Sequence, residues 1–185
     1  MIAIITIILS GLLMNSEKQI FEFSSVETSG KWQIINDVVM GGVSESGLTF
    51  NENGSARFAG TLSPDNNGGF ASVRANVEEK NLNEFDGVII KAKGDGNIYN
   101  LRFRTNENYD GVSYQAKFKS TSEEWKEFRI PFQEFKATFR GRIVPNQPEL
   151  KSENIRQIGI LIADNQFGDF ELDVKWIKFY KNNER

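Results

Sequence analysis

Hydrophobic and polar residues alternate in short segments along most of the chain after residue 19. Alternation with a period of two is typical of a β-strand with one buried and one exposed face. The turn Gly94-Asp95-Gly96-Asn97 separates two such segments, and this composition predicts a β-hairpin. After Trp176 the apolar positions change face, which predicts a β-bulge in the last strand. The alternation is clearest over residues 88–93, 99–104, 112–118 and 170–176.

These segments number about ten and are separated by turn-rich stretches. No amphipathic helix of convincing length interrupts them, and helical segments are restricted to short stretches near 78–85 and 148–154. Many short strands joined by turns predict an all-β, antiparallel β-sandwich or jelly roll. We therefore expect one jelly-roll domain over residues 20–182, without an internal repeat or a second domain.

A nearly uninterrupted apolar run covers residues 1–14. It is shorter than the roughly 17–25 residues of a membrane-spanning helix, and no Lys or Arg precedes it as in a signal peptide. A signal-like export segment, a short membrane anchor and a core strand are the alternatives, and consecutive isoleucines without alternation favour the first two. Residues 15–19 are then a polar linker. We expect an exported or membrane-associated protein, or alternatively a cytoplasmic one, with membrane contact only through residues 1–14.

The 185 residues include no Cys and no His and carry a net charge of -3. These absences exclude zinc sites built on Cys or His and nucleophiles activated by His. The charge gives no reason to expect nucleic acid as a partner. A carboxylate enzyme such as a glycosidase needs two carboxyl groups facing each other, and no such pair stands out. Calcium needs about six to eight oxygen ligands, for which Asp164, Asn165 and Asp169 are the best, sparse candidates. We expect no catalytic residue, no metal and no cofactor.

A glycine-hinged turn, Asn36-Asp37-Val38-Val39-Met40-Gly41-Gly42-Val43-Ser44, separates two segments with strand character. Asp37 is interpreted as a turn residue whose side chain binds backbone N–H groups, with a ligand or metal contact as the alternative. The glycines supply a positive φ or let the backbone pack closely. Met40 and Trp32 are core residues or exposed anchors for a partner, and the core is favoured. The residues assigned to this motif are Trp32, Asn36, Asp37, Met40, Gly41, Gly42, Ser44 and Gly69.

Alternation also places polar side chains together on the outward face of adjacent strands. If Leu101 and Phe103 face the core, Arg102 and Arg104 face outward. Such a face suits a carboxylate, a sugar or an acidic protein surface, because arginine binds carboxylates in a bidentate manner. The alternative is a solvated face whose arginines pair with neighbouring Glu residues. The expected partner- or ligand-binding residues are Phe70, Arg74, Arg102, Arg104, Gln115, Arg140 and Arg142.

Glycine-rich and aromatic motifs follow one another over about residues 21–180. The pattern D-x-V-M-G-G-x-S, which begins at Asp37, together with a downstream G-G-F, is the most specific of them. In this order the motifs resemble the complex I intermediate-associated protein 30 family. The motifs are Trp32 with 36–44, 58–63, 68–74, 93–99, Trp125 with 129–132, and 139–142.

The resemblance implies a galactose-binding-like jelly roll and a non-catalytic, chaperone-like role, similar to that of the mitochondrial members in assembling respiratory complex I (NADH:ubiquinone oxidoreductase). It therefore implies a protein partner. The alternative is a carbohydrate-binding module of the galactose-binding-like type, which exposed rings at Trp125, Tyr99 or Tyr109 would favour. The mitochondrial members begin with an Arg-rich amphipathic targeting segment, whereas this chain begins with an apolar one.

Overall fold

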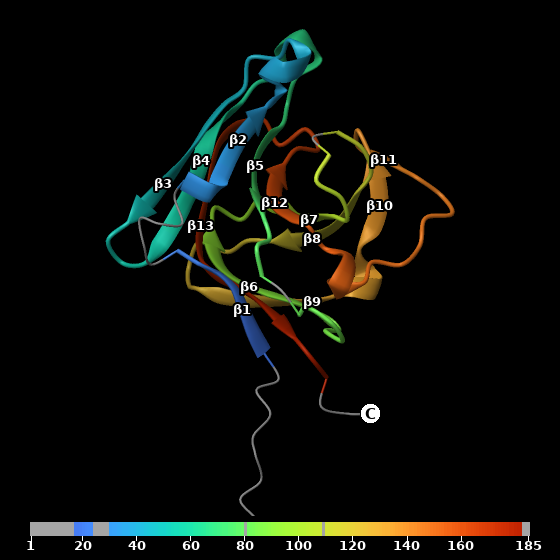
Figure 1. Ribbon diagram of the computed structural model, residues 1–185. Coiled ribbons are helices and arrows are strands. Elements are labelled where there is room, and N and C mark those ends of the chain that lie inside the picture. The colour runs from blue at the N-terminus through green and yellow to red at the C-terminus, as the bar shows by residue number, and fades with distance from the viewer. Residues whose placement is uncertain (1–16, 24–29, 80, 109, 183–185) are drawn as a thin grey trace, which may run out of the picture.

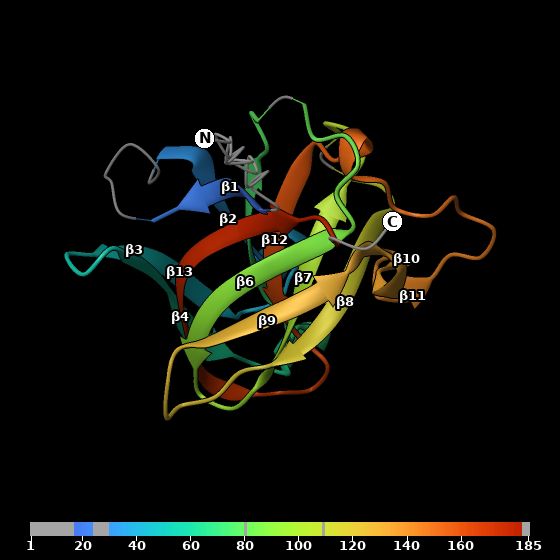
Figure 2. The same ribbon diagram turned by 90° about the horizontal axis from the view of Figure 1, so that it is seen from below.

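The computed structural model describes residues 17–23, 30–79, 81–108 and 110–182. Over these residues the chain forms two antiparallel sheets that face each other across an apolar core (Figures 1 and 2). The predicted all-β sandwich is therefore confirmed. The apolar run at 1–14 lies outside the described residues, so its assignment stays a prediction.

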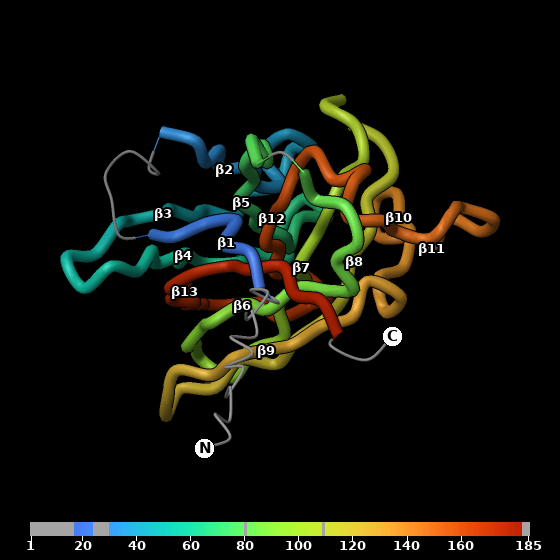
Figure 3. Tube along the Cα trace, turned by 60° about the horizontal axis from the view of Figure 1, so that its bottom comes forward, coloured from blue at the N-terminus to red at the C-terminus, as the bar shows by residue number. Residues whose placement is uncertain are grey.

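The six-stranded sheet is built around the long last strand, β13, which pairs with three others. Figure 3 shows β1 lying beside β13, and Glu17 is opposite Tyr180 in this pair. β1 thus begins inside the range 15–19 that the sequence analysis treats as a linker. A register shift confirms a bulge in the last strand, but it lies between Val174 and Trp176 and not after Trp176 as predicted. The strands are β3 (Glu45–Asn51), β4 (Ser55–Leu62), β13 (Gly168–Tyr180), β6 (Gly87–Gly94) and β9 (Lys126–Pro131), in this order, with β1 (Glu17–Glu22) on β13.

The seven-stranded sheet carries the outward-facing arginines. Its inner face is apolar because alternate residues of each strand, such as Leu101 and Ile160, point into the sandwich and are buried. In spatial order its strands are β11 (Arg142–Ile143), β10 (Lys136–Phe139), β8 (Ser113–Lys119), β7 (Ile98–Arg104), β12 (Gln157–Ile162), β5 (Ala71–Asn76) and β2 (Trp32–Asn36).

Short 3-10 turns are the helical elements of the described residues. The described residues of the stretch 78–85 form no helix, and η5 occupies the end of the stretch 148–154. No helix in the described part of the chain is long and apolar enough to cross a membrane. The turns are η2 (Asp37–Met40), η3 (Asp65–Asn67), η4 (Phe132–Glu134) and η5 (Ser152–Asn154).

Aromatic rings fill much of the core between the sheets. Phe103 lies 5.1 Å from Phe135 and 5.8 Å from Phe179, measured between ring centroids. Trp32 is buried and packs 5.2 Å from Phe21, a residue of β1, which confirms its assignment to the core. Rings packed at these distances add stabilisation beyond the area they bury, and they hold the two sheets in a fixed relation.

Candidate functional site

The buried carboxylate of Asp37 organises the glycine turn. Its Oδ1 accepts the backbone N–H of Ser44 at 2.9 Å, and its Oδ2 accepts the Ser44 hydroxyl at 2.5 Å. The same Oδ2 accepts the N–H groups of Gly69 at 2.5 Å and Phe70 at 3.3 Å. Burial acts to raise the pKa of Asp37, but these hydrogen bonds outweigh it, and the net pKa lies below the usual value. These contacts support the interpretation of Asp37 as a turn residue.

Two glycines beside this carboxylate are required for different reasons. Gly41 ends η2 in the left-handed region, with φ of 90°, in open space. Gly42 has no such φ, but a Cβ at this position would collide with the Asp37 side chain. Of the two explanations that the sequence left open, positive φ thus applies to Gly41 and close packing to Gly42.

The buried Asp37 fixes a turn whose next residues point into solvent. Val38, Val39 and Met40 are 60%, 63% and 65% exposed, and the half-exposed ring of Phe167 lies against Gly69. Met40 is therefore an exposed residue, and the favoured prediction that it belongs to the core is wrong. The physical reason is that η2 is a single short turn, and its buried contact is made by the Asp37 carboxylate. We call Val38, Val39 and Met40 the apolar turn.

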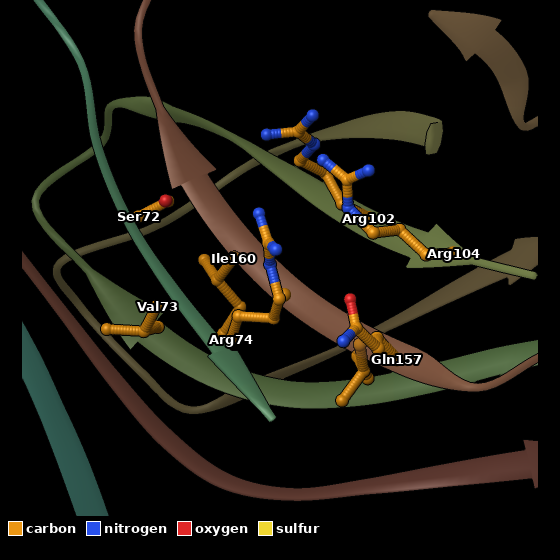
Figure 4. Close-up of a pocket in the computed structure, with 9 residues that line it drawn as sticks. Ser72, Val73, Arg74, Arg102, Arg104, Gln157 and Ile160 are labelled. Carbon is orange, nitrogen blue, oxygen red and sulfur yellow. The ribbon is translucent and has the colours of Figure 1, made fainter. Parts of the chain in front are cut away.

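A second feature lies on the outer face of the seven-stranded sheet, where strand register brings arginines together. Arg102 of β7 is opposite Gly159 of β12, and Gly159 is opposite Arg74 of β5. Because Gly159 has no side chain, the floor between the two arginines is open. Figure 4 shows Arg74 on one strand beside β12 and Arg102 and Arg104 on the strand beyond it, with Gln157 near them on β12. We call this feature the arginine hollow; Ser72, Val73, Arg74, Arg102, Arg104, Gln157, Ile158, Gly159 and Ile160 line it.

Arg102 and Arg104 donate hydrogen bonds to neutral groups. Arg102 donates from Nη2 to the Ser113 hydroxyl at 2.7 Å, and its buried Nε has no hydrogen-bond partner. Arg104 is only 6% exposed and donates from Nη1 to the carbonyl oxygen of Gly111 at 2.9 Å. Within the described part of the chain, neither arginine forms an ion pair. Their charge is therefore not neutralised by a contacting carboxylate.

The pKa values report the same accumulation of positive charge. Burial, followed by the charges of Arg104 and Arg74, lowers the pKa of Arg102 to about 10. Burial and then Arg74 also lower the pKa of Arg104, while the charge of Asp110 acts in the opposite direction. Asp110 itself pairs with Arg140 at 3.0 Å. Arg102 and Arg104 stay protonated near neutral pH, so both bring a positive charge to the hollow.

The structure brings together some of the predicted recognition residues and separates others. Arg74, Arg102 and Arg104 line the hollow, and Gln115 is opposite Arg102 in the pairing of β7 with β8. Phe70 belongs to the Asp37 turn through its backbone, since its carbonyl oxygen accepts the N–H of Asp37 at 3.2 Å. Arg140 and Arg142 are exposed beside the β10–β11 connection and do not line the hollow.

Gln157 and Gly159 line the hollow but are not among the binding residues that the sequence predicted. Gln157 donates from Nε2 to Asn76 Oδ1 at 3.1 Å, and its buried Oε1 has no hydrogen-bond partner. The alternation of Ile158, Ile160 and Ile162 already places both residues on the outward side of β12. Alternation does not predict the strand register, which places Gly159 between two arginines.

The other predicted candidates have ordinary structural roles. Asp164 pairs with Lys117 at 2.7 Å, and Asp169 accepts the Thr61 hydroxyl at 2.7 Å. Asn165 adopts a left-handed backbone conformation with φ of 60°. In the described residues no group of three or more acidic, His or Cys side chains could hold a metal ion. Asp164, Asn165 and Asp169 are thus not gathered into a calcium site.

Exposed rings at three positions were expected to favour a sugar. Tyr99 is completely buried and donates its hydroxyl to Asp95 Oδ2 at 3.0 Å, so it offers no stacking surface. Trp125 is half-buried, with the Lys175 ammonium 5.9 Å from its ring centroid. Tyr109 lies outside the described residues. Among the described residues, no aromatic side chain lines the hollow.

The fold defines the class of the protein as a jelly-roll β-sandwich module. Family comparison is more specific, and the chain belongs to the complex I intermediate-associated protein 30 (CIA30) family, whose model matches residues 21–174. An uncharacterized protein of Schizosaccharomyces pombe is 34% identical over 172 residues, which cover 82% of this chain and 78% of the relative. The mouse mitochondrial complex I intermediate-associated protein 30 is 26% identical, over 91% of this chain and only 58% of its own length.

Solved structures share the fold at low sequence identity. The family 11 carbohydrate-binding module of a cellulosomal cellulase from Clostridium thermocellum superposes with a TM-score of 0.66 at 20% identity, covering 91% of this chain and 96% of that chain. A structure of a family 11 module from the same organism in complex with a β-1,3-1,4-mixed-linked tetrasaccharide gives a TM-score of 0.65. At such identities the likeness describes the fold alone.

Proposed function

We propose that this domain is a non-catalytic binding module that holds a protein partner on the outer face of its seven-stranded sheet, in a chaperone-like or assembly role similar to that of the named mitochondrial relatives. One observation carries the proposal. The guanidinium of Arg104 is buried, and that of Arg102 is half-buried, without a contacting carboxylate. Burying unpaired charge is costly, and a partner that supplies the opposite charge gives a reason for keeping it.

The chemistry of the hollow suits binding better than catalysis. Its polar lining consists of arginine, Gln157 and Ser72. Arginine does not exchange protons near neutral pH, and neither an amide nor an unactivated hydroxyl is a general acid or base there. The exposed apolar turn supports a protein partner in addition, because exposed apolar residues on a fixed backbone are typical of protein-binding surfaces.

Comparative capture tests the proposal. The tagged protein, its Arg102→Gln variant and its Arg142→Gln variant are used as baits in cells of the organism that encodes it, and the captured proteins are quantified by mass spectrometry. Arg142 is the matched control, because it is an exposed arginine outside the hollow. We expect a protein that the parent and Arg142→Gln baits retain and the Arg102→Gln bait loses. The purified protein should then bind the parent domain in calorimetry. Equal capture by all three baits contradicts the proposal.

A carbohydrate ligand is the second candidate. The observation in its favour is a hollow lined by arginine and amide side chains, which can bind hydroxyl groups, in a fold shared with a module solved in complex with a tetrasaccharide. The described lining of the hollow has no aromatic ring for a sugar to stack on, which argues against a carbohydrate ligand. Calorimetric titration with mixed-linked β-glucan oligosaccharides distinguishes the two. Saturable binding that Arg102→Gln abolishes would favour the sugar.

A further inference from the structure

We propose that the arginine hollow is a carboxylate site, in which the space above Gly159, between Arg102 and Arg74, receives the side-chain carboxylate of an Asp or Glu residue on the protein partner. This inference rests on the proposed function and names the chemical group that the hollow recognises.

Register builds the space. Across the sheet the order is Arg102, Gly159, Arg74, each directly opposite the next. A side chain at position 159 would stand between Arg102 and Arg74 in this row of the sheet. A Cβ there would also lie 2.9 Å from the carbonyl oxygen of Val73, so the backbone is packed for glycine. The open floor and its flanking cations thus occupy one row of the sheet.

The donors of the hollow are only partly used. Arg102 donates one hydrogen bond from Nη2 to the Ser113 hydroxyl, and its Nε–H has no acceptor among the described residues. A guanidinium has five N–H donors in a planar fork that matches the two oxygens of a carboxylate. Leaving such a donor buried and unsatisfied costs free energy. A carboxylate oxygen in the hollow would supply the missing acceptor once the Arg102 side chain turns its buried Nε–H toward it, and a neutral amide or hydroxyl would be a weaker acceptor.

Charge selects an anion over a neutral ligand. Arg104 and Arg74 disfavour the positive charge of Arg102, Arg74 disfavours that of Arg104, and Asp110, which favours the charge of Arg104, is paired with Arg140. The repulsion among the arginines is present in the free protein and is relieved when an anion binds. Binding should therefore stabilise the folded domain by mass action.

Size selects one small group over a whole sugar ring. The hollow is shallow, with room for about one water molecule between its side chains. A carboxylate at the end of a flexible side chain can enter such a space, while a pyranose ring would have to remain above it. The side chain carrying the carboxylate then extends outward, where the rest of the partner lies on the sheet.

Small anions serve as probes because the partner is unidentified. Acetate, glutarate, inorganic phosphate and chloride are titrated into the full domain at constant ionic strength, and the response is read as the melting temperature and as the NMR shift of the Arg102 Nε–H. We expect saturable carboxylate binding in the millimolar range, with glutarate and acetate raising the melting temperature and moving the Arg102 signal. The variants Arg102→Lys and Arg74→Gln should weaken acetate binding by about tenfold, while the exposed control Arg142→Gln should not change it.

Four outcomes overturn the inference. Chloride as effective as acetate would show general screening, and a response to phosphate without one to carboxylates would assign a different anion. Carboxylate binding that survives in Arg102→Lys and Arg74→Gln would place the site elsewhere. If the anions fail while Arg102→Gln still abolishes partner capture, the carboxylate assignment is wrong and the proposed function stands. If Arg102→Gln leaves partner capture unchanged but acetate binds at Arg102, the hollow binds carboxylates and the proposed function is wrong.

Discussion

The carboxylate of Asp37 accepts the backbone N–H of Gly69 at 2.5 Å, across 32 positions of sequence. This bond joins the turn after β2 to the loop that leads into β5, the strand that β2 pairs with. Ser44 extends the connection, because its hydroxyl donates to Asp37 and accepts the N–H of Ser63 at 3.0 Å. The two glycine-containing motifs of the sequence are therefore parts of one buried hydrogen-bond network.

Replacing Asp37 with Ala should lower the free energy of unfolding by about 2–4 kcal/mol, because it leaves several buried N–H and O–H donors without an acceptor. Urea unfolding followed by tryptophan fluorescence measures the effect. Asp65→Asn is the matched control, since Asp65 is an exposed carboxylate in the loop that carries Gly69. A loss below about 0.5 kcal/mol in Asp37→Ala would contradict the role given to the network.

The glycines of the turn should respond differently to substitution. Gly41→Asn should cost less than about 1 kcal/mol, because Asn tolerates the left-handed region and the space is open. Gly41→Val should cost roughly 1–3 kcal/mol through backbone strain. Gly42→Ala should exceed Gly41→Asn, since its Cβ would displace an Asp37 side chain that several hydrogen bonds hold in place. Chemical denaturation of the three variants tests this order, and a Gly42→Ala variant as stable as the parent would refute it.

Asp37 should also contribute to acid denaturation. Its pKa is lowered in the folded protein, so its stabilising contribution is present above the unfolded pKa of about 3.9 and is lost as pH falls through the lower, folded value. The difference in unfolding free energy between the parent and Asp37→Asn should therefore shrink as pH falls from about 5 to below about 3. Urea midpoints of both proteins at each pH measure it. A difference that stays constant over this range would contradict the sign.

The sequence predicted the fold well because alternation is a local property. The burial of Leu101, Ile160 and Val174, and a bulge in the last strand, all follow from which side chains share a face. Asp37 could be assigned to a turn for the same reason, since Asp before a glycine pair is local turn chemistry.

The site was harder to predict because it depends on relations between strands. Nothing near Arg102 in the sequence indicates that Gly159 lies opposite it, 57 positions later (159 minus 102). Alternation assigns Arg104 to the outward face, but it does not report that other parts of the chain cover that face and leave the side chain 6% exposed. The exposure of Met40 was missed for the opposite reason, because an apolar residue type was taken as evidence of burial.

Truncation at the N-terminus separates the apolar run from β1. A protein beginning at Asn15 retains β1, so we expect it to melt cooperatively at nearly the parent temperature. A protein beginning at Ser24 loses Phe21 and Phe23, which pack against Trp32 at 5.2 and 5.4 Å, and should be less stable by at least about 3 kcal/mol. Calorimetric melting of both proteins provides the comparison. Aggregation or a broad transition in the Asn15 protein would mean that residues 1–14 belong to the core.

Stability should distinguish a recognition arginine from a structural one. Replacing both Arg102 and Arg104 with Glu would be neutral if both were solvent-facing, but Arg104 is buried, so that double variant should be destabilised. Arg104→Gln should cost about 0.5–1.5 kcal/mol, because it loses the bond to the Gly111 carbonyl. Arg102→Gln should stay within about 1 kcal/mol of the parent, because the loss of its bond to Ser113 is offset by relief of repulsion from Arg74 and Arg104. Urea unfolding of the single variants measures both effects, and Arg142→Gln is the exposed control.

An Arg102→Gln variant that is both stable and defective in partner capture fits a residue kept for binding at no gain in stability. A loss above about 2 kcal/mol would instead make Arg102 part of the structural framework of the sheet.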